Sequence, residues 1–485
     1  MQGENPSQLD AQAMLQEILD LKAECENQRG RIADLEHRIA IQPQTGLPSR
    51  YRLEIELDEL IDRLRVEEDK RGFTLLILQL GDDYTNIRKT LKASVSEWIL
   101  YQTGMRMAGM LRPQDLLFHT HENEFVVALM GLKGPELGSF LRPFLTRLSE
   151  AHIFAGLNIA LKVTAGAAYW PEHGEGRHQI LQSADIAAGD SRVRHRGFSL
   201  FNPSLLARAV EKVELQNAIT KAFENIDEQF FLLFQPKIFV SELEGNRLRI
   251  NTVEAEVLIR WKHPERGVIQ PDDFIPLAEE TGLIMPLGKW LIYQSTRKLV
   301  STRAAARICS GMSINLSARQ FHSDDATRIL ATALARSGAQ AEDLTIELTE
   351  TGFFDDPQAA ARTIARFKEL GVRISMDDFG TGYSSLSHLH RFPLHEIKID
   401  KQFVEHLDSS SDDRVIVRSL VSIATGMKLA LVAEGVETSE AVKMLWEMGC
   451  KGFQGFLFAK PLDERGFIDF CNRIADANMV WDLAA

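Results

Sequence analysis

Apolar residues recur at alternating steps of four and three near the start of the chain, for example at Met14, Ile18 and Leu21. This spacing is the seam of a coiled coil, in which paired helices bury an apolar stripe between them. Pro43 ends the predicted helix, because proline cannot continue it. We therefore predict an N-terminal coiled-coil helix over residues 1–41 that forms a parallel dimer. The alternative is a single amphipathic helix that packs on the next domain.

The pattern changes after residue 41, where buried strand-like runs alternate with helical stretches. The predicted strands are residues 73–80, 124–130 and 159–168, and the predicted helices are residues 94–110 and 139–151. Hairpin signals occur among them, so residues 42–203 predict an α/β domain with antiparallel strand pairs. Residues 204–210, which follow Pro203, are predicted to form a linker.

Residues 211–485 show a repeated alternation of strand and helix. The predicted strands are residues 230–235, 253–261, 311–317, 344–349, 372–378, 396–400, 428–434 and 452–458. Such a series of strands interleaved with helices is typical of a (βα)8 barrel. Polar side chains at the carboxyl ends of barrel strands are the usual catalytic candidates.

The 485-residue chain has a formal net charge of −13, with 45% hydrophobic and 25% charged residues. The length predicts two or three domains. The acidic charge disfavours nucleic-acid binding through the overall field, so an anionic substrate would need local cations such as metals. The 4 cysteines include no CxxC pair, which fits a reducing compartment without disulfides. Without a signal segment or an apolar run of about 18 residues, we expect a soluble cytoplasmic protein with no membrane insertion.

Acidic and amide side chains stand at or near the carboxyl ends of the predicted barrel strands. They are Glu256, Asn315, Glu347, Glu350, Asp377, Asp378, Glu434 and Gln454, accompanied by Lys398. Any one of them could be a buried polar group with a local partner, and Asp377-Asp378 by itself could cap a helix or form an Asx-turn. Several acids without matching bases would repel one another unless cations neutralise them. Divalent cations prefer such oxygen ligands, so the pattern predicts a metal site.

Two segments in the first half carry a family resemblance, namely Thr45-Gly-Leu-Pro-Ser-Arg50 and Phe118-His-Thr-His-Glu-Asn-Glu-Phe125. Through them, residues 42–203 resemble a GGDEF domain of the diguanylate cyclase family, which has a ferredoxin-like nucleotide-cyclase fold. The family's Gly-Gly-Asp-Glu-Phe turn is replaced by residues 121–125, where side chains crowd the place of the glycines and an amide replaces a carboxylate. The strand that should supply another metal-binding acid ends in Gln79-Leu80-Gly81. We predict a regulatory domain without cyclase activity, with GTP as a candidate ligand.

Arg112-Pro-Gln-Asp115 stands just ahead of this turn. The same resemblance implies that Arg112 and Asp115 are the remnant of an RxxD product-inhibition site, since arginine binds guanine or phosphate with two hydrogen bonds. The alternative is a surface salt bridge between these two side chains.

The strand-end motifs of residues 211–485 together resemble an EAL domain, the cyclic di-GMP phosphodiesterase family. They include Glu-Val-Leu-Ile-Arg-Trp at residues 256–261, Glu-Leu-Thr-Glu at 347–350, Asp-Asp-Phe-Gly at 377–380 and Ile-Lys-Ile-Asp at 397–400. The family fold is a modified TIM barrel with one reversed strand, so this is the fold that the resemblance implies.

The resemblance implies roles for the matching residues. The implied ligands of two Mg²⁺ or Mn²⁺ ions are Glu256, Asn315, Glu347, Asp377, Asp378 and Glu434, with Asp377 bridging. Lys398 is implied to position the attacking water, Gln454 to support that network and Glu350 to brace the loop of residues 379–386. Gln235 and Arg260 are implied to contact the dinucleotide.

The sequence departs from the family pattern at three places. Val257 replaces the central alanine of the naming motif, Lys237 follows Gln-Pro where an apolar residue is common, and His395-Glu396 stands where an aspartate is common. None of these changes removes an implied metal ligand. Val257 could crowd its strand and change the rate. His395 could make activity sensitive to pH, although a solvated histidine is the simpler interpretation.

These observations predict a metal-dependent phosphodiesterase that linearises cyclic di-GMP to pGpG and is regulated by its GGDEF-like domain. We expect a homodimer through the coiled coil and the EAL domain, and an upstream signalling protein as a further partner. One alternative is a receptor that binds cyclic di-GMP without cleaving it. Another is an adaptor that docks a partner through its N-terminal parts.

Overall fold

The computed structural model describes residues 22, 24, 28, 39–67, 72–194, 197–323, 325–350, 353, 357–380 and 392–484. The chain divides into two compact units, Met1–Glu211 and Lys212–Ala485. Almost all of the predicted coiled coil over residues 1–41 lies outside the described residues. Among the described residues, none of the helices combines the length and the hydropathy that a membrane span requires.

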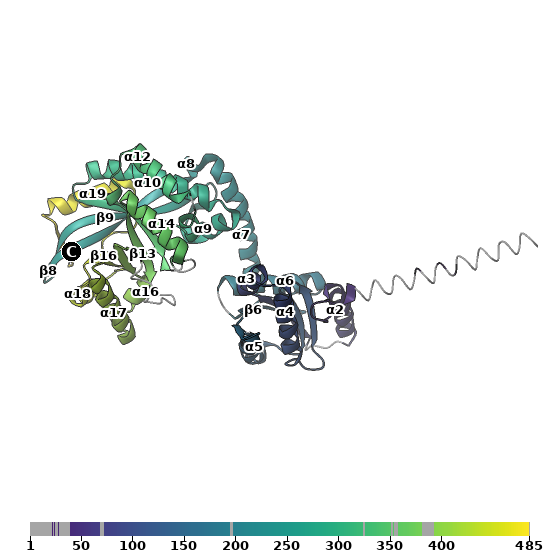
Figure 1. Cartoon of the computed structure of the whole chain (residues 1–485). Helices are drawn as coiled ribbons and strands as arrows, with labels where there is room; N and C mark the ends of the chain where they lie inside the picture. Colours follow the sequence, from purple (N-terminus) through teal and green to yellow (C-terminus); the bar gives the residue numbers. More distant parts are fainter. Residues whose placement is uncertain are drawn as a thin grey trace, which may run out of the picture. The chain divides into compact units, whose positions relative to one another are not determined.

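The first unit is built on a five-stranded sheet with the order β2-β3-β1-β6-β7 (Figure 1). Its strands are β1 (Phe73–Leu80), β2 (Leu116–His121), β3 (Glu124–Met130), β6 (Val163–Trp170) and β7 (Phe198–Leu200), beside the small pair β4 (His152–Phe154) and β5 (Leu157–Ile159). Its helices are α2 (Arg50–Val66), α3 (Asp82–Thr90), α4 (Ala93–Ala108), α5 (Gly134–Leu148) and α6 (Arg177–Val193). The central strand β1 pairs antiparallel with β3 and β6, which confirms the predicted α/β sheet with antiparallel pairs.

Both faces of this sheet are covered, because β1 is apolar on both sides. Leu76 and Leu78 face a core that includes residues of α4 and α5, whereas Leu75 and Ile77 face a core that includes residues of α2 and α6. Successive residues of a strand point to opposite faces, so one continuous apolar run serves both cores. The helix α6 packs closely on β6 at Gly166, where an added Cβ would lie 2.0 Å from the backbone nitrogen of Ala188.

The second unit is a closed barrel of eight strands surrounded by helices (Figure 1). The barrel strands are β8 (Phe230–Glu244), β9 (Arg247–His263), β11 (Cys309–Asn315), β12 (Leu344–Thr349), β13 (Arg373–Phe379), β14 (Glu396–Ile399), β15 (Ala430–Ala433) and β16 (Gly452–Gln454). The strand β8 runs antiparallel to both of its neighbours, β9 and β16, while the other adjacent pairs are parallel. This confirms the modified TIM barrel with one reversed strand.

Helices on the outside of the barrel bury the outward faces of the strands. They are α9 (Pro271–Thr281), α10 (Ile284–Ala305), α12 (Ala326–Ser337), α14 (Pro357–Leu370), α17 (Ser411–Met427), α18 (Ser439–Met448) and α19 (Glu464–Asp476). Shorter elements are η1 (Phe223–Asn225), α8 (Ile226–Gln229), α11 (Ala318–Phe321), η2 (Ala341–Asp343) and α16 (Lys401–Glu405), with β10 (Gly267–Ile269) and β17 (Val480–Asp482) paired to β9. The outer helices and the strands share one apolar core.

The predicted linker at residues 204–210 requires a correction, since it is helical. The helix α7 (Pro203–Ala222) contains all of residues 204–210. Proline is well tolerated at the first position of a helix, where its missing N–H group has no intrahelical partner to lose. Pro203 therefore begins a helix here and does not mark a break in secondary structure. The hairpin of β8 and β9 also extends further than the sequence predicted, to Glu244 and Arg247.

Candidate functional site

The ammonium group of Lys398 lies among carboxylates at the carboxyl ends of the barrel strands. Its side chain is fully buried on β14. The Nζ atom is 2.5 Å from Oε1 of Glu434 and 2.8 Å from Oε2 of Glu347. It is also 3.3 Å from Oε2 of Glu256 and 3.4 Å from Oδ1 of Asp377. The barrel thus brings together four acids from four different strands or strand ends around a single lysine.

The adjacent acids Asp377 and Asp378 converge on the same site although neighbours on a regular strand point to opposite faces. The register of β13 against β14 shifts between Met376 and Phe379, and Asp378 adopts a left-handed backbone with φ of 55°. Oxygen atoms of Asp377, Asp378 and Glu434 consequently lie within 4.8 Å of one another. A non-glycine residue in this backbone region is uncommon and often marks a functional site.

Amide side chains hold Glu256 in place within the cluster. Nδ2 of Asn315 donates to Oε1 of Glu256 at 2.7 Å, and Nε2 of Gln454 donates to Oε2 at 2.5 Å. The Gln454 amide also donates to Oε1 of Gln235 at 3.2 Å. Glu350 lies beside the cluster, where its Oε2 accepts a hydrogen bond at 3.0 Å from the backbone N–H of Gly380. The loop that Glu350 was predicted to brace lies mostly outside the described residues.

Burial and charge move the pKa values of these groups in different directions. Burial, reinforced by nearby acids, raises the pKa of Glu434 to about 7 despite the charge of Lys398. Burial and a hydrogen bond with Asp400 raise the pKa of Asp378 to about 6. Burial alone would also raise the pKa of Glu347, but Lys398 and Lys237 outweigh it and lower that pKa to about 2.

The donor set suits hard divalent cations. At the mouth of the barrel, the carboxylates of Glu256, Glu347, Asp377 and Glu434 surround the ammonium group of Lys398. The Asp378 carboxylate lies beside those of Asp377 and Glu434. Carboxylate and amide oxygens are the ligands that Mg²⁺ and Mn²⁺ prefer, and no thiol or imidazole belongs to this set. Two divalent cations would neutralise the excess negative charge. The residues present therefore fit a site for divalent metal.

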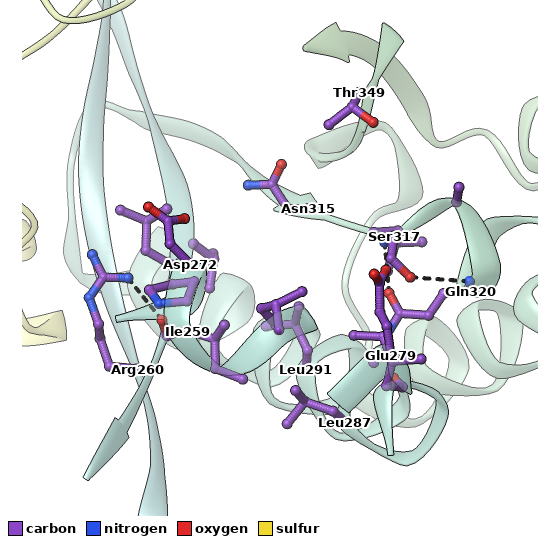
Figure 2. A pocket seen from close by; sticks show the side chains of 18 of the residues that line it. Ile259, Arg260, Asp272, Glu279, Leu287, Leu291, Asn315, Ser317, Gln320 and Thr349 are labelled. Atoms are coloured by element: carbon purple, nitrogen blue, oxygen red, sulfur yellow. Dashed lines mark hydrogen bonds between the residues drawn. The ribbon is translucent and has the colours of Figure 1, made fainter. Parts of the chain in front are cut away.

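A cavity of about 720 Å³ opens beside this cluster and shares Asn315 with it (Figure 2). Figure 2 shows Leu287 and Leu291 between Arg260 at one side of the cavity and Ser317 at the other. Arg260 is largely buried, and its Nη1 donates to the carbonyl oxygen of Ile259 at 2.8 Å. The cavity thus combines an apolar surface with a cation near the carboxylate cluster.

The turn that replaces the GGDEF motif joins β2 and β3 in the first unit. Its Glu124 carboxylate is hydrogen-bonded by Thr120 at 2.7 Å, by His121 at 2.9 Å and by Gln79 at 3.3 Å. A cavity of about 220 Å³ nearby is lined in part by Tyr84, Arg88 and Glu122, and the last two form an ion pair.

Arg112 and Asp115, the predicted inhibitory site, bind each other. Nε and Nη2 of Arg112 donate to the Asp115 carboxylate at 2.9 and 2.8 Å. The Asp115 side chain is 0% exposed, and its Oδ1 also accepts a hydrogen bond from the backbone N–H of Met130. The structure therefore contains the salt bridge that was the alternative interpretation, and the inhibitory role stays a prediction.

Sequence reasoning missed a second group of charges inside the barrel. Lys237, noted only as a departure from the family pattern, is 0% exposed and binds Glu347 and Glu396. Glu254 binds Arg373 nearby. The available signal was that charged residues interrupt otherwise apolar strands. His395, in contrast, has an exposed side chain whose Nδ1 accepts a hydrogen bond from the backbone of the neighbouring strand.

The chain belongs to the EAL domain family, because the sequence profile of that family matches residues 214–461. A second profile, described as diguanylate cyclase, GGDEF domain, matches residues 40–197. The predicted tandem of a GGDEF domain followed by an EAL domain is confirmed.

Curated relatives align over most of this chain. It is 31% identical over 419 residues to the bifunctional diguanylate cyclase/cyclic di-GMP phosphodiesterase MucR of Pseudomonas aeruginosa, covering 86% of this chain and 59% of MucR. It is 32% identical over 424 residues to the cyclic di-GMP phosphodiesterase PdeR of Escherichia coli, covering 87% of this chain and 62% of PdeR. The chain therefore spans less than two thirds of these relatives.

A solved structure has a similar fold over both units. The S helix-GGDEF-EAL portion of Vibrio cholerae LapD, bound to c-di-GMP, matches with a TM-score of 0.60, covering 89% of this chain and 99% of that chain. The sequence identity is 16%, so this likeness concerns the fold alone.

Proposed function

We propose that this protein is a phosphodiesterase that hydrolyses cyclic di-GMP to linear pGpG with the help of two Mg²⁺ or Mn²⁺ ions. The observation that carries the proposal is the cluster of carboxylates around the buried Lys398 at one mouth of the barrel. Membership of the EAL family and the phosphodiesterase names of MucR and PdeR support the same activity.

The acids of the cluster are the proposed metal ligands. One ion would be held by Glu256, Asn315, Glu347 and Asp377, and the second by Asp377, Asp378 and Glu434. When bound, such ions make a water molecule acidic enough to act as a nucleophile and stabilise charge on the entering and leaving oxygens.

The polar groups around the ligands have complementary roles. The ammonium group of Lys398 orients the attacking water and offsets the negative charge that develops on the phosphate. Gln454 fixes Glu256 by donating to its Oε2 atom. Glu350 holds the start of the next loop through the N–H of Gly380. These residues are positioned by strands of one closed barrel, which keeps their geometry rigid.

The cavity beside the cluster is the proposed binding site for one half of the dinucleotide. Its apolar surface at Leu287 and Leu291 would contact a guanine base, and Arg260 would pair with a phosphate. Gln235, which is hydrogen-bonded to Gln454, would contact the substrate from the reversed strand β8.

The first unit is the proposed regulatory part. Its turn carries His121 and Glu122 in place of two glycines, so we expect no cyclase activity, while GTP remains the proposed ligand of this unit. The Arg112–Asp115 pair is proposed as an inhibitory site only if cyclic di-GMP can displace the salt bridge. We further propose a cytoplasmic homodimer that receives its signal from another protein.

The proposed activity is tested by incubating the purified protein with cyclic di-GMP and Mg²⁺ or Mn²⁺, and by separating pGpG chromatographically. We expect turnover in the wild type and a loss of at least about 100-fold in Glu256→Ala, because a metal ligand is removed. Glu242→Ala is the matched control, since Glu242 lies on the hairpin of β8 and is largely exposed. Binding of cyclic di-GMP without turnover in the wild type would identify a receptor.

A further inference from the structure

A second ionic layer lies inside the barrel, deeper than the carboxylate cluster. It consists of Lys237, Glu254, Arg373 and Glu396, which we name the inner ionic layer. The Lys237 Nζ atom is 3.1 Å from Oε1 of Glu396 and 3.7 Å from Oε2 of Glu254. Arg373 donates from Nη1 to Oε1 of Glu254 at 2.7 Å. Lys237 and Glu396 are 0% exposed, so these charges interact in a medium that screens them little.

The reversed strand β8 explains why Lys237 lies at this depth. Gln235, on the same strand, lies at the mouth of the barrel. Its amide nitrogen donates a hydrogen bond to the carbonyl oxygen of Ala459, and its amide oxygen accepts one from Gln454. Residues two positions apart on a strand share a face, and β8 runs in the opposite direction to its neighbours. Moving forward from Gln235 to Lys237 therefore leads from the mouth into the barrel.

Glu347 connects the inner ionic layer to the carboxylate cluster. Its Oε1 atom is 3.1 Å from Nζ of Lys237, and its Oε2 atom is 2.8 Å from Nζ of Lys398. Both oxygens of this fully buried carboxylate are thus engaged by lysines from two different strands. Such a two-sided arrangement fixes the plane of the carboxylate and leaves it little rotational freedom.

The charges of the inner ionic layer show that Lys237 does more than neutralise the carboxylates at the mouth of the barrel. The inner ionic layer contains two cations, Lys237 and Arg373, and two acids, Glu254 and Glu396, so it is neutral by itself. Glu347 therefore keeps its negative charge available for a cation at the mouth. Besides its positive charge, Lys237 gives Glu347 an oriented hydrogen bond.

We propose that Lys237 is a positioning residue that orients the metal ligand Glu347 from inside the barrel. This inference rests on the proposed function only in taking Glu347 as a metal ligand. Groups that hydrogen-bond a metal ligand without touching the metal fix the orientation of that ligand. Their removal typically weakens metal binding by about 10- to 100-fold. If Lys237 acted only through its positive charge, its removal would instead strengthen metal binding, because the incoming cation would be repelled less. The direction of the change in affinity therefore separates the two explanations.

The test uses the full chain stripped with EDTA, with Mn²⁺ binding measured by calorimetric titration in the absence of substrate. Lys237→Met alone would leave the layer with one uncompensated acid, Glu396, because Glu254 keeps its ion pair with Arg373, so it is combined with Glu396→Gln. The matched control is Glu396→Gln alone, which keeps the contact between Lys237 and Glu347. The control gains one net positive charge in the layer, so we expect it to bind Mn²⁺ no more tightly than the wild type. The double variant is neutral again, and we expect it to bind Mn²⁺ about 10-fold more weakly than the control.

Equal Mn²⁺ affinity in the double variant and the control would overturn the inference, and so would tighter binding in the double variant. If thermal denaturation shows that the double variant does not fold, Lys237→Gln with Glu396→Gln replaces it. The amide nitrogen of this side chain ends about one bond short of the lysine ammonium, so weaker Mn²⁺ binding than in the control is again expected. Wild-type protein that binds Mn²⁺ without hydrolysing cyclic di-GMP would refute the proposed function while leaving this comparison valid.

Discussion

At the scale of single residues, the carboxylate cluster contains more negative groups than the single positive charge of Lys398 can balance. Lys398 contacts four carboxylates, yet Asp378 and Glu434 retain raised pKa values because burial disfavours their charged forms. A protein keeps such an arrangement only where something compensates it, and a divalent cation is the natural compensation. The left-handed backbone at Asp378 adds to this argument, since it is the local change that brings adjacent acids to one side.

Protons and metal ions should compete for these carboxylates. Burial raises the pKa of Glu434 to about 7 and that of Asp378 to about 6, so both groups must release protons before an ion binds. We expect the affinity for Mn²⁺ to fall about tenfold or more when the pH is lowered from about 8 to about 5.5. Calorimetric titration of the EDTA-stripped protein across this range measures the change.

Glu434→Gln is the informative variant for this pH dependence. It removes the group that titrates near neutrality, so its affinity for Mn²⁺, although lower, should begin to fall only near the pKa of Asp378, about 6. A wild-type affinity that is the same at both ends of the pH range would show that these carboxylates do not bind the ion.

At the scale of elements, the close contact between α6 and β6 leaves no room for a side chain at one position of the strand. In the first unit, α6 approaches β6 so closely that a Cβ on Gly166 would meet the backbone of Ala184 and Ala188 at 2.2 and 2.0 Å. Backbone atoms cannot give way as a flexible side chain can. The glycine is therefore what allows the helix to cover this face of the sheet.

Gly166→Ala should destabilise the first unit by about 2–3 kcal/mol or more, because the added methyl group overpacks the contact between helix and sheet. Gly138→Ala is the matched control: Gly138 lies within α5, and an added Cβ there meets nothing within 4 Å. Its higher helix propensity should stabilise the unit by roughly 0.5–1 kcal/mol. Scanning calorimetry of the full chain, following the transition of the first unit, compares the two, and similar shifts in both variants would contradict the packing argument.

At the scale of the whole molecule, the two units have separate cores but share one helix in the sequence. Leu205, near the start of α7, belongs to a core of the first unit. Leu215 and Ile219, later in the same helix, belong to the core of the barrel. The barrel thus needs the second half of α7, although the helix begins before the boundary at Glu211 and Lys212.

This predicts where the barrel can be separated from the rest of the chain. A fragment of residues 203–485 should fold and keep the hydrolytic activity proposed above. A fragment of residues 224–485 lacks Leu215 and Ile219, and loss of such buried side chains should destabilise it by about 3 kcal/mol or more. Urea denaturation of both fragments measures the difference, and equal stabilities would mean that α7 contributes nothing to the barrel.

Much of the fold and of the candidate site was predictable from local patterns. Apolar runs interrupted by turns predicted the barrel strands, and the acids at their ends predicted that Glu256, Glu347 and Asp377 would gather at one mouth. This works because parallel barrel strands all place their carboxyl ends on the same side. Position along a strand therefore already specifies which mouth a residue occupies.

The sequence by itself determined the order of the domains, the strands of the barrel and the residue types available for chemistry. Only the tertiary structure decided that Lys237 turns inward to hold Glu347, that Arg112 binds Asp115, and that residues 204–210 are helical. The physical reason is that periodicity reports which face of an element is buried. Which oxygen meets which nitrogen depends on the closure of the barrel and on the direction of β8, and these bring together residues far apart in the chain.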